Sequence, residues 1–384
     1  MRIALVAGET SGDALGAALI EALKARFPAA QFAGVAGPKM QAAGCAAWFD
    51  IEELSVMGLT EILKHLPKLM RLRSELRTRI LAWKPDVFIG IDYKEFNLGL
   101  ARQLKRAGLA TVQYVSPQVW AWRPGRARTI GESVDLVLCL FPFEPAFYRE
   151  YGVHAAFVGH PLADQIPLQP DRAGARAALG IAAGVRVLAV LPGSRRGEVE
   201  KLAEPFAGAA ELLARKFPGL VCIAPMVTPA LRDLFAAHCA RRAPTANVRM
   251  LDGHARAALA AADVVLVASG TATLETALSK RPMVVAYRLG AITAFLLRTL
   301  GLVKVRHFSQ PNLLAGTELV PEFFQEAASP ENLSAALARW LEQPQSVTRV
   351  TQEFARIHEK LRCDGARRAA AEIAELIAVR VATP

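Results

Sequence analysis

Short runs of β-branched and other apolar residues alternate along the chain with segments of helical period. Segments 14–26 and 200–216, for example, repeat their apolar residues at the spacing of one helix face. The apolar runs predict strands at 3–7, 32–36, 87–92, 111–115, 134–140, 155–158, 187–191, 220–224, 248–251, 264–268 and 283–286. Strand–helix alternation at this spacing is typical of parallel, doubly wound sheets, so we expect an α/β fold.

The alternation stops once, in a stretch that opens at Gly159 and carries Pro161, Pro167 and Pro170. Proline fixes φ and lacks an amide donor, so this stretch predicts a stiff connector between two sheets. We expect a Rossmann-like domain at 1–163, a second at 164–345 that faces it across a cleft, and a helical segment at 346–384 that packs back on another part of the molecule. Ligands of open parallel sheets bind at the carboxyl ends of strands, so the motifs that follow strands carry most weight.

A glycine turn follows the predicted strand 187–191, with the sequence PGSRRG at 192–197 leading into a helix. Such a turn presents backbone N–H groups and the positive end of the helix dipole, which favours phosphate. We therefore predict that the amides of Gly193 and Ser194 and the guanidinium of Arg195 bind a nucleotide diphosphate. The alternative is a tight turn with two solvated arginines.

A second turn of small residues, SGTATLE at 269–275, follows the predicted strand 264–268. Ser269, Gly270 and Thr271 at a helix start offer further N–H donors, or they act as ordinary caps. Glu275 would lie in the first turns of that helix, where a carboxylate can accept from both hydroxyls of a ribose. Together the two turns predict a nucleotide diphosphate site in the second domain.

The first predicted strand leads into AGETSGD at 7–13, which has the position of a dinucleotide loop but lacks G-x-G-x-x-G. Its carboxylates, Glu9 and Asp13, would repel a pyrophosphate. We therefore predict that Glu9, Ser11 and Asp13 bind a hydroxyl-rich ligand. The alternative is that Ser11 or Asp13 merely caps the helix.

Two further loops of the first domain carry candidate chemistry. Asp92 closes the strand 87–92 and can act as a general base for a substrate hydroxyl within hydrogen-bond reach, with a capping role as the alternative and Glu95 as a rival base. The loop SPQVWAWR at 116–123 places Trp120 and Arg123 where they can stack on a sugar and hold a phosphate. A hydrophobic anchor with exposed arginines is the alternative there.

Composition narrows the class of partner. Hydrophobic residues make up 53% and charged residues 21% of the 384 positions, which excludes a largely disordered chain. Lysine and arginine number 46 and the acids 35, so the net charge is 46 − 35 = +11, which favours nucleic acid, a phosphorylated ligand or an acidic membrane surface. The positive charges are dispersed and form no recognised nucleic-acid module, so we expect no nucleic-acid partner.

The cysteines and the apolar windows indicate the compartment. The five cysteines are scattered, without C-x-x-C pairs or the cysteine–histidine spacing of a zinc site. We expect reduced core thiols, no bound metal and no cofactor. The first apolar run is too short for a signal peptide, and no window reaches the ~18 apolar residues of a spanning helix. We therefore expect a cytoplasmic protein that can touch a membrane without crossing it.

Two basic, apolar stretches point to lipid. Residues 57–83 carry many basic side chains against only Glu61 and Glu75, and Pro67 is expected to split them into two short helices. Residues 291–302 are strongly apolar, and 288–317 contain no acid. Basic amphipathic segments lie on anionic bilayers or hold acyl chains, although apolar helix faces are as often core. The candidates for acyl contact are Leu59, Ile62, Leu63, Leu66, Leu69, Met70, Phe295, Leu296 and Leu297.

The order and spacing of the loop sequences resemble those of a known family. The strings are AGETSGD at 7–13, VAGP at 35–38, Ile91-Asp92 with Phe96-Asn97, YVSPQVWAWR at 114–123, GHPL at 159–162, LPGSR at 191–195, ASGTATLE at 268–275 and PNLLAG at 311–316. From the first strand to beyond residue 316, the chain resembles the lipid-A-disaccharide synthases.

The resemblance implies a GT-B type, UDP-dependent glycosyltransferase that needs no metal. The reaction would join UDP-2,3-diacylglucosamine to 2,3-diacylglucosamine 1-phosphate with inversion, giving a β-1,6-linked disaccharide 1-phosphate and UDP. It would take place on the cytoplasmic face of the inner membrane, with the enzyme bound peripherally. Implied roles are Asp92 as base, Arg195 for the leaving diphosphate, Glu275 for the ribose, Asn312 for the nucleotide, and Glu9, Ser11, Asp13, Asn97, Trp120 and Arg123 for the acceptor.

One departure from the family pattern lies beside Asp92. Relatives commonly read Asp-x-Pro-Asp-Phe-Asn, whereas this chain has Lys94 and Glu95 at the third and fourth positions. Lys94 is expected to lower the pKa of Asp92. Two other functions stay open: a UDP-sugar 2-epimerase on the same scaffold, and a non-catalytic basic module that binds membrane or nucleic acid. The sequence also leaves open the acyl-chain length and whether the protein is a homodimer.

Overall fold

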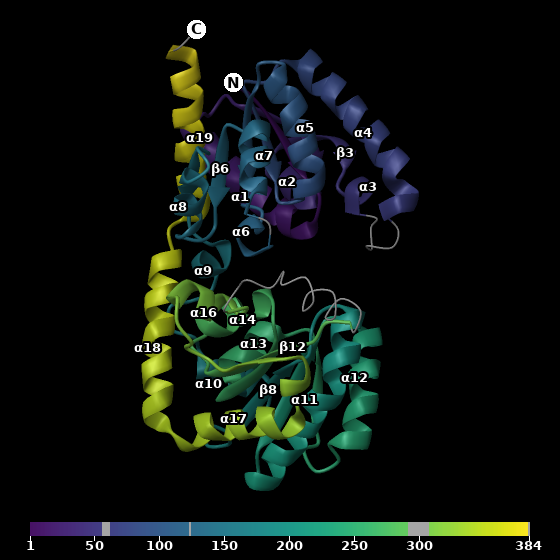
Figure 1. The fold of residues 1–384 in the computed structure, drawn as a ribbon, viewed down its shortest axis with the longest axis vertical. Helices are drawn as coiled ribbons and strands as arrows, with labels where there is room; N and C mark the ends of the chain where they lie inside the picture. Colours follow the sequence, from purple (N-terminus) through teal and green to yellow (C-terminus); the bar gives the residue numbers. More distant parts are fainter. Residues whose placement is uncertain (56–61, 123, 291–306, 383–384) are drawn as a thin grey trace. The chain divides into compact units, whose positions relative to one another are not determined.

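The computed structural model describes residues 1–55, 62–122, 124–290 and 307–382. Tertiary contacts divide the chain into two compact units, each with its own parallel sheet (Figure 1). The first unit comprises Met1–Asp164 together with the chain from Leu361 onward, and the second comprises Gln165–Lys360. Along the described ranges, no helix combines the length and the apolar character that crossing a bilayer requires.

The first unit is built on a seven-stranded sheet in the order β3-β2-β1-β4-β5-β6-β7, with all neighbours parallel. The strands are β1 (Arg2–Ala7), β2 (Gln31–Ala36), β3 (Cys45–Asp50), β4 (Val87–Ile91), β5 (Ala110–Tyr114), β6 (Leu136–Cys139) and β7 (Ala155–Phe157). The sequence did not predict β3. Its sequence CAAWFD is apolar but contains no β-branched residue, and as an edge strand it has exposed or half-buried side chains after Cys45.

Helices cover both faces of this sheet. Alternate residues of β1 enter different cores: Ile3 and Leu5 pack into one, and Ala4 and Val6 into the other. The helices are α1 (Thr10–Arg26), α2 (Pro38–Ala42), α3 (Glu52–Ser55), α4 (Ile62–Trp83), α5 (Lys94–Arg106), α6 (Val119–Trp122), α7 (Arg126–Ser133), α8 (Glu144–Arg149), α9 (Pro161–Gln165) and α19 (Gly365–Ala382). The sheet is therefore doubly wound, as predicted.

Helix α4 runs through Pro67, so the predicted split into two short helices is wrong. Proline removes one backbone hydrogen bond, and here it lies near the start of a long helix. Farther along α4, Leu72, Leu76 and Ile80 are buried in the core of the first unit. This packing anchors the part of the helix that follows Pro67.

The second unit is built on a six-stranded parallel sheet in the order β10-β9-β8-β11-β12-β13. Its strands are β8 (Val187–Leu191), β9 (Val221–Met226), β10 (Arg249–Asp252), β11 (Val264–Ala268), β12 (Met283–Tyr287) and β13 (Glu322–Phe324). Its helices are α10 (Arg172–Ala178), α11 (Arg196–Lys216), α12 (Pro229–Arg242), α13 (Ala255–Ala261), α14 (Thr271–Leu278), α16 (Gln310–Ala315), the 3₁₀ helix η1 (Gln325–Ala327), α17 (Pro330–Glu342) and α18 (Pro344–Leu361). The three-residue β13 was not predicted, because so short a run carries no periodic signal.

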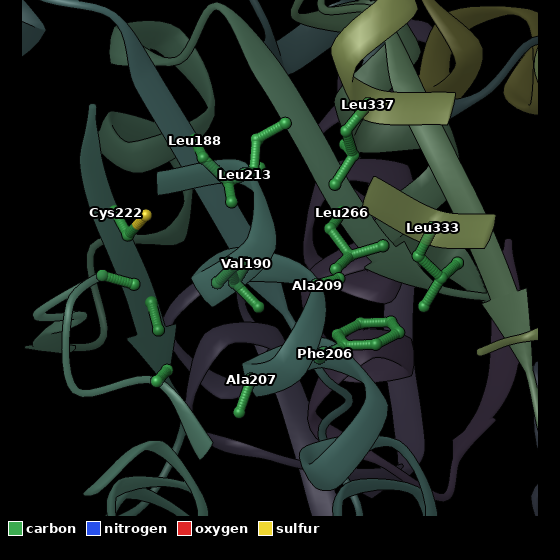
Figure 2. Close-up of a cluster of buried hydrophobic side chains, with 14 of the residues drawn as sticks. Leu188, Val190, Phe206, Ala207, Ala209, Leu213, Cys222, Leu266, Leu333 and Leu337 are labelled. Atoms are coloured by element: carbon green, nitrogen blue, oxygen red, sulfur yellow. The ribbon is translucent and has the colours of Figure 1, made fainter. Parts of the chain in front are cut away.

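A large core of the second unit lies between the sheet and the helices α11, α12 and α17. Leu188 of β8 and Leu266 of β11 meet Phe206 of α11 and Leu337 of α17, and all four side chains are fully buried (Figure 2). Continuous apolar strands of this kind are expected where both faces of a parallel sheet are covered.

Each sheet has one place where the strand order reverses. In the first unit, β1 has β2 on one side and β4 on the other, and in the second unit β8 likewise lies between β9 and β11. Ligands of open α/β sheets bind outside the carboxyl ends of the two strands that flank such a reversal. The loops after β1, β4, β8 and β11 are therefore the candidate ligand-binding loops. They carry, in this order, the AGETSGD sequence, Asp92, the PGSR sequence and the SGTATLE sequence.

The C-terminal helices belong to different units. Helix α18 is part of the second unit as far as Lys360, whereas Ala369, Ala370 and Ile373 of α19 are buried in the core of the first unit. The start of α19 is fixed by Asp164, whose carboxylate accepts from the backbone N–H groups of Asp364 (3.0 Å) and Gly365 (2.8 Å).

Candidate functional site

Asp92 occupies a conformationally costly turn at the end of β4. Its φ is +54°, in the left-handed region that non-glycine residues rarely enter. The backbone is held there on both sides: the Asp92 N–H donates to the carbonyl of Tyr114 (2.8 Å), and its carbonyl accepts from Nε2 of Gln113 (2.8 Å). Gln113 is fully buried. The turn is thus imposed by the sheet, which is typical of residues placed for function.

The surroundings of the half-buried Asp92 favour its neutral form. Burial is the main cause of its raised pKa, and the negative charge of Glu9 adds to it. Lys94 and a hydrogen bond from the Ser11 side chain act in the opposite direction but are outweighed. The expected influence of Lys94 thus has the right sign, while the net shift is upward. A carboxylate with a raised pKa is a stronger proton acceptor than a free aspartate.

The loop after β1 brings two predicted acceptor residues to Asp92. Glu9 and Ser11 are exposed, and both act on its titration. Gly8 lets the loop after β1 pack closely against Tyr93, the residue after Asp92, since a Cβ on Gly8 would lie 2.3 Å from Cγ of the Tyr93 ring. Tyr93 in turn donates from its hydroxyl to the carbonyl of Leu54 (3.3 Å). The rival base, Glu95, has a side chain that is 67% exposed and lies 4.0 Å from Nζ of Lys94.

Asp13 and Asn97, two other residues predicted to bind the acceptor substrate, are buried beneath the loops around Asp92. The Asp13 carboxylate is 2% exposed and accepts from the N–H groups of Gly37 (3.0 Å), Lys39 (2.9 Å) and Met40 (3.0 Å) at the start of α2. Asn97 is fully buried, and its Nδ2 donates to the carbonyls that end β1 and β4, Val6 and Ile91 (3.2 Å each). Both side chains hold the loops together.

Trp120 is tied to a buried carboxyl group that the sequence analysis missed. Its Nε1 donates to Glu144 (3.2 Å), and its ring meets Phe143 edge-on at 4.9 Å. Glu144 is 1% exposed, and burial raises its pKa to about 7 although it also accepts from the N–H of Phe141 (2.9 Å). The available signal was its position just after β6, at the carboxyl edge of the sheet. Arg123 lies outside the described residues.

In the second unit, the turn between β8 and α11 contains Gly193, Ser194 and Arg195. Gly193 has φ +132°, which favours glycine. The Arg195 side chain is 85% exposed, so its guanidinium is available to a ligand. The N–H groups of Ser194 and Arg195, however, donate to Oε2 of Glu198 (3.1 and 3.3 Å). Sequence reasoning missed Glu198, although a glutamate three residues after a helix N-cap is a known capping signal.

Among the residues that the structure describes, the start of α14 has no side-chain cap. Gly270, at φ +148°, precedes the helix and offers no side-chain cap, and Thr271 is exposed. The hydroxyls nearby are already hydrogen-bonded: Ser269 donates to the carbonyl of Phe308 before α16 (3.0 Å), and Thr273 donates to that of Gly270 (2.8 Å). Uncapped N–H groups at a helix start are suited to an anion.

Glu275 is half-buried on the second turn of α14, and burial raises its pKa. Arg256 of α13, which the sequence analysis missed, acts in the opposite direction. Asn312, the predicted nucleotide contact, is fully buried: its Nδ2 donates to Val320 O and to Glu322 (2.9 Å each), and its Oδ1 accepts from the N–H groups of Leu319 (2.8 Å) and Val320 (3.0 Å). Asn312 therefore joins α16 to the segment before β13.

The lipid candidates are described only in part. Leu59, Phe295, Leu296 and Leu297 lie outside the described residues, and Ile62, Leu63 and Leu66 belong to α4 with their side chains outside the description. Leu69 packs against the core of the first unit, whereas Met70 is 52% exposed. The described basic side chains Lys68, Arg71, Arg77 and Arg79 of α4 are exposed. The outer face of α4 is therefore basic, and its inner face belongs to the core.

Sequence comparison identifies one family. The lipid-A-disaccharide synthetase family model matches residues 3–376. The lipid-A-disaccharide synthase of Xanthomonas campestris pv. campestris (strain 8004) is 52% identical over 380 residues, covering 99% of this chain and 87% of the relative. That of Xylella fastidiosa (strain M12) is 51% identical over 380 residues and covers 99% of both chains.

Solved structures share the fold at low identity. UDP-GlcNAc 2-epimerase from Neisseria meningitidis bound to UDP-GlcNAc has a TM-score of 0.65 and 14% identity, with 98% of this chain and 99% of that chain covered. The glycotransferase of kitacinnamycin has a TM-score of 0.60 and 18% identity, with 98% of both chains covered. These likenesses confirm the predicted two-domain α/β fold of GT-B type. Because the family match spans nearly the whole chain, the protein belongs to the lipid-A-disaccharide synthase family and is a glycosyltransferase.

Proposed function

We propose that this glycosyltransferase joins UDP-2,3-diacylglucosamine to 2,3-diacylglucosamine 1-phosphate. The 6′-hydroxyl of the acceptor attacks the anomeric carbon of the donor, and the bond to UDP breaks as the new β-1,6 bond forms. The α-linked donor and β-linked product mean a single displacement with inversion. The products are the tetra-acylated disaccharide 1-phosphate and UDP.

Asp92 takes the proton of the attacking hydroxyl in this proposal. The observation that carries the assignment is its turn at the reversal between β1 and β4, where burial and Glu9 raise its pKa. A base is most effective when its pKa approaches the working pH. Glu9 and Ser11 contact the acceptor sugar beside it, and Trp120 lies at a neighbouring strand end of the same sheet. Asp13 and Asn97 serve by fixing the loops.

The second unit binds the nucleotide in this proposal. The guanidinium of Arg195 and the open start of α14 at Gly270–Thr271 receive the diphosphate and stabilise its charge as it leaves. Glu275 accepts from the ribose hydroxyls. Ser194 and Ser269 shape the two turns, and Asn312 holds α16 in place behind them. No divalent ion enters this mechanism, because Arg195 and the helix start supply the positive charge.

The substrates are lipids, so the enzyme must reach a membrane surface. The net charge of +11 and the basic outer face of α4, with Met70 exposed among the charges, support peripheral binding to the anionic cytoplasmic face of the inner membrane. The proposed acyl contacts are the exposed Met70, the outward part of the half-buried Leu69, and the apolar residues at 59–66 and 295–297. Binding of this kind is expected to weaken as salt screens the charges.

The proposal is tested with purified protein and detergent micelles that hold both diacyl sugars, in the presence of EDTA. Mass spectrometry follows the disaccharide 1-phosphate and UDP, and proton NMR identifies the new anomeric linkage. We expect a β-linked product at full rate in EDTA. An α-linked product, or turnover that EDTA abolishes and Mg²⁺ restores, would contradict the mechanism. If the protein binds UDP but forms no disaccharide, the assignment of the nucleotide site would stand and the proposed substrates would be refuted.

A further inference from the structure

The turn that was predicted to hold the diphosphate already holds a carboxylate of the chain itself. Glu198, the third residue of α11, accepts through Oε2 from the N–H groups of Ser194 (3.1 Å) and Arg195 (3.3 Å). Its Oε1 lies 3.6 Å from Nη1 of Arg195. One carboxylate thus fixes both the backbone of the turn and the side chain that leaves it.

The fit between this carboxylate and the turn is close. A Cβ placed on Gly193 would lie 2.7 Å from Cβ of Glu198, closer than real side-chain atoms approach. The positive φ of Gly193 independently favours glycine. The glycine of the PGSR sequence is therefore required for the approach of Glu198 to the turn, as well as for the turn itself.

The two helix starts at this edge of the sheet differ in charge. At α11 the carboxylate of Glu198 already occupies the amides of Ser194 and Arg195, and a second anion there would meet a like charge at close range. At α14 the preceding residue is Gly270, which has no side chain to cap the helix. An incoming diphosphate is therefore favoured at the start of α14 and at the Arg195 guanidinium, which is 85% exposed.

Building on the proposed UDP-sugar reaction, we propose that Glu198 is a positioning residue for the nucleotide. It holds the turn 193–195 so that the guanidinium of Arg195, and not the amides of Ser194 and Arg195, meets the diphosphate. Tyr287, at the end of β12, lies within the electrostatic influence of both Glu198 and Arg195. Burial is the main cause of its raised pKa, while Glu198 raises and Arg195 lowers it. Both charges therefore lie close enough to Tyr287 to influence it, and Tyr287 ends β12 at the carboxyl edge of the sheet, where ligands of such sheets bind.

The test measures the UDP dissociation constant by calorimetry, together with donor KM and kcat, for Glu198→Gln and Glu198→Ala. The glutamine keeps an oxygen that can accept from both amides, so its UDP affinity should stay within about threefold of the wild type. The alanine releases the turn, so UDP should bind about tenfold more weakly and donor KM should rise more than kcat falls. Glu200→Ala is the matched control, because it removes an exposed carboxylate of the same helix that pairs with Arg196 (2.7 Å).

A double-mutant cycle tests whether Glu198 acts through Arg195. Adding Glu198→Ala to Arg195→Ala should weaken UDP binding little further, because the group being positioned is gone. Additive losses in the double variant would overturn the proposal. So would tighter UDP binding by both Glu198 variants, which would make Glu198 a competitor that UDP displaces. A lower melting temperature of Glu198→Ala with unchanged UDP affinity would reduce Glu198 to a helix cap. Failure of the wild type to bind UDP would instead refute the proposed function.

Discussion

The two sheet edges have the same topology and carry opposite chemistry. At the reversal between β1 and β4, the loops present Glu9, Asp92 and the hydroxyl of Ser11. At the reversal between β8 and β11, they present the guanidinium of Arg195 and the start of α14, which has no side-chain cap among the described residues. The same arrangement of strands can therefore hold a proton acceptor in one unit and receive an anion in the other.

The difference lies in how each unit uses its acids. In the first unit Glu9 stays exposed beside Asp92 and raises the pKa of that carboxyl group. In the second unit Glu198 turns into its own loop, and two backbone N–H groups satisfy it. The exposed Glu9 makes the neighbouring Asp92 a stronger proton acceptor. Glu198, by contrast, is bound within its own turn, so the guanidinium of Arg195 and the start of α14 keep that sheet edge positive.

The largest expected effect comes from removing the base. Asp92→Asn keeps the size of the side chain and the backbone hydrogen bonds of the turn but cannot accept the proton, so turnover should fall ~100- to 10,000-fold. The measurement is the rate of disaccharide formation in micelles. Glu95→Gln is the control and should keep most of the activity, because Glu95 is exposed and pairs with Lys94. A larger loss in Glu95→Gln than in Asp92→Asn would move the base to Glu95.

The next effect comes from the second edge. Arg195→Ala removes a cation from the diphosphate as negative charge develops on the leaving UDP, so turnover should fall ~100- to 1,000-fold. Steady-state rates at saturating donor measure this loss. Arg196→Ala is the matched control, since Arg196 pairs with Glu200 on the exposed side of α11. Equal losses in the two variants would show that only general positive charge matters.

A third change should affect stability far more than the chemistry. Asp13→Ala leaves three N–H groups of the α2 start without their acceptor, and the free energy of unfolding should fall by about 2–4 kcal/mol. Urea unfolding measures this, and turnover per folded molecule should change little. Glu9→Gln is the counterpart, because Glu9 is exposed and its loss should leave the unfolding midpoint unchanged. Unchanged stability of Asp13→Ala, with weaker acceptor binding, would return Asp13 to the acceptor site.

The smallest expected effect is a shift of the pH profile. Asp92 is active when ionised, so its raised pKa places the acidic limb of kcat/KM above the usual range for aspartate, and activity is lost as pH falls through it. Glu9→Gln removes a charge that raises this pKa, so the limb should move to lower pH. Lys94→Gln removes a charge that lowers it, so the limb should move to higher pH. If the acidic limb moves in the same direction in both variants, it does not report the ionisation of Asp92.

Much of the fold could be predicted because its signals are local. Apolar runs rich in β-branched residues located the central strands, whereas β3 was missed because its sequence CAAWFD has no β-branched residue, and β13 because it has three residues. Pro67 was misjudged because the packing of α4 in the core outweighs one lost hydrogen bond. Tertiary context decided each of these cases.

The loops that form the candidate sites could be located from the sequence, but the roles of their individual side chains were harder to predict. Asp13 and Asn97 lie within a few residues of Glu9 and Asp92, and Asn312 lies in another of the candidate motifs, yet the polar groups of all three are turned inward to other parts of the chain. Sequence position alone does not separate these two kinds of residue. Glu198 and Glu144 were missed for the converse reason. Their positions, at the third residue of a helix and just after a strand, were visible in the sequence, but the backbone amides that they accept from are defined only by the folded turns.

The most direct test of the central claim is the UDP dissociation constant of the Asp92→Asn protein, measured by calorimetry alongside its turnover. If the acidic edge moves the proton and the other edge holds the nucleotide, UDP should bind within about twofold of the wild type while turnover is lost. UDP binding weakened tenfold or more, in step with turnover, would contradict this division of roles between the two sheet edges.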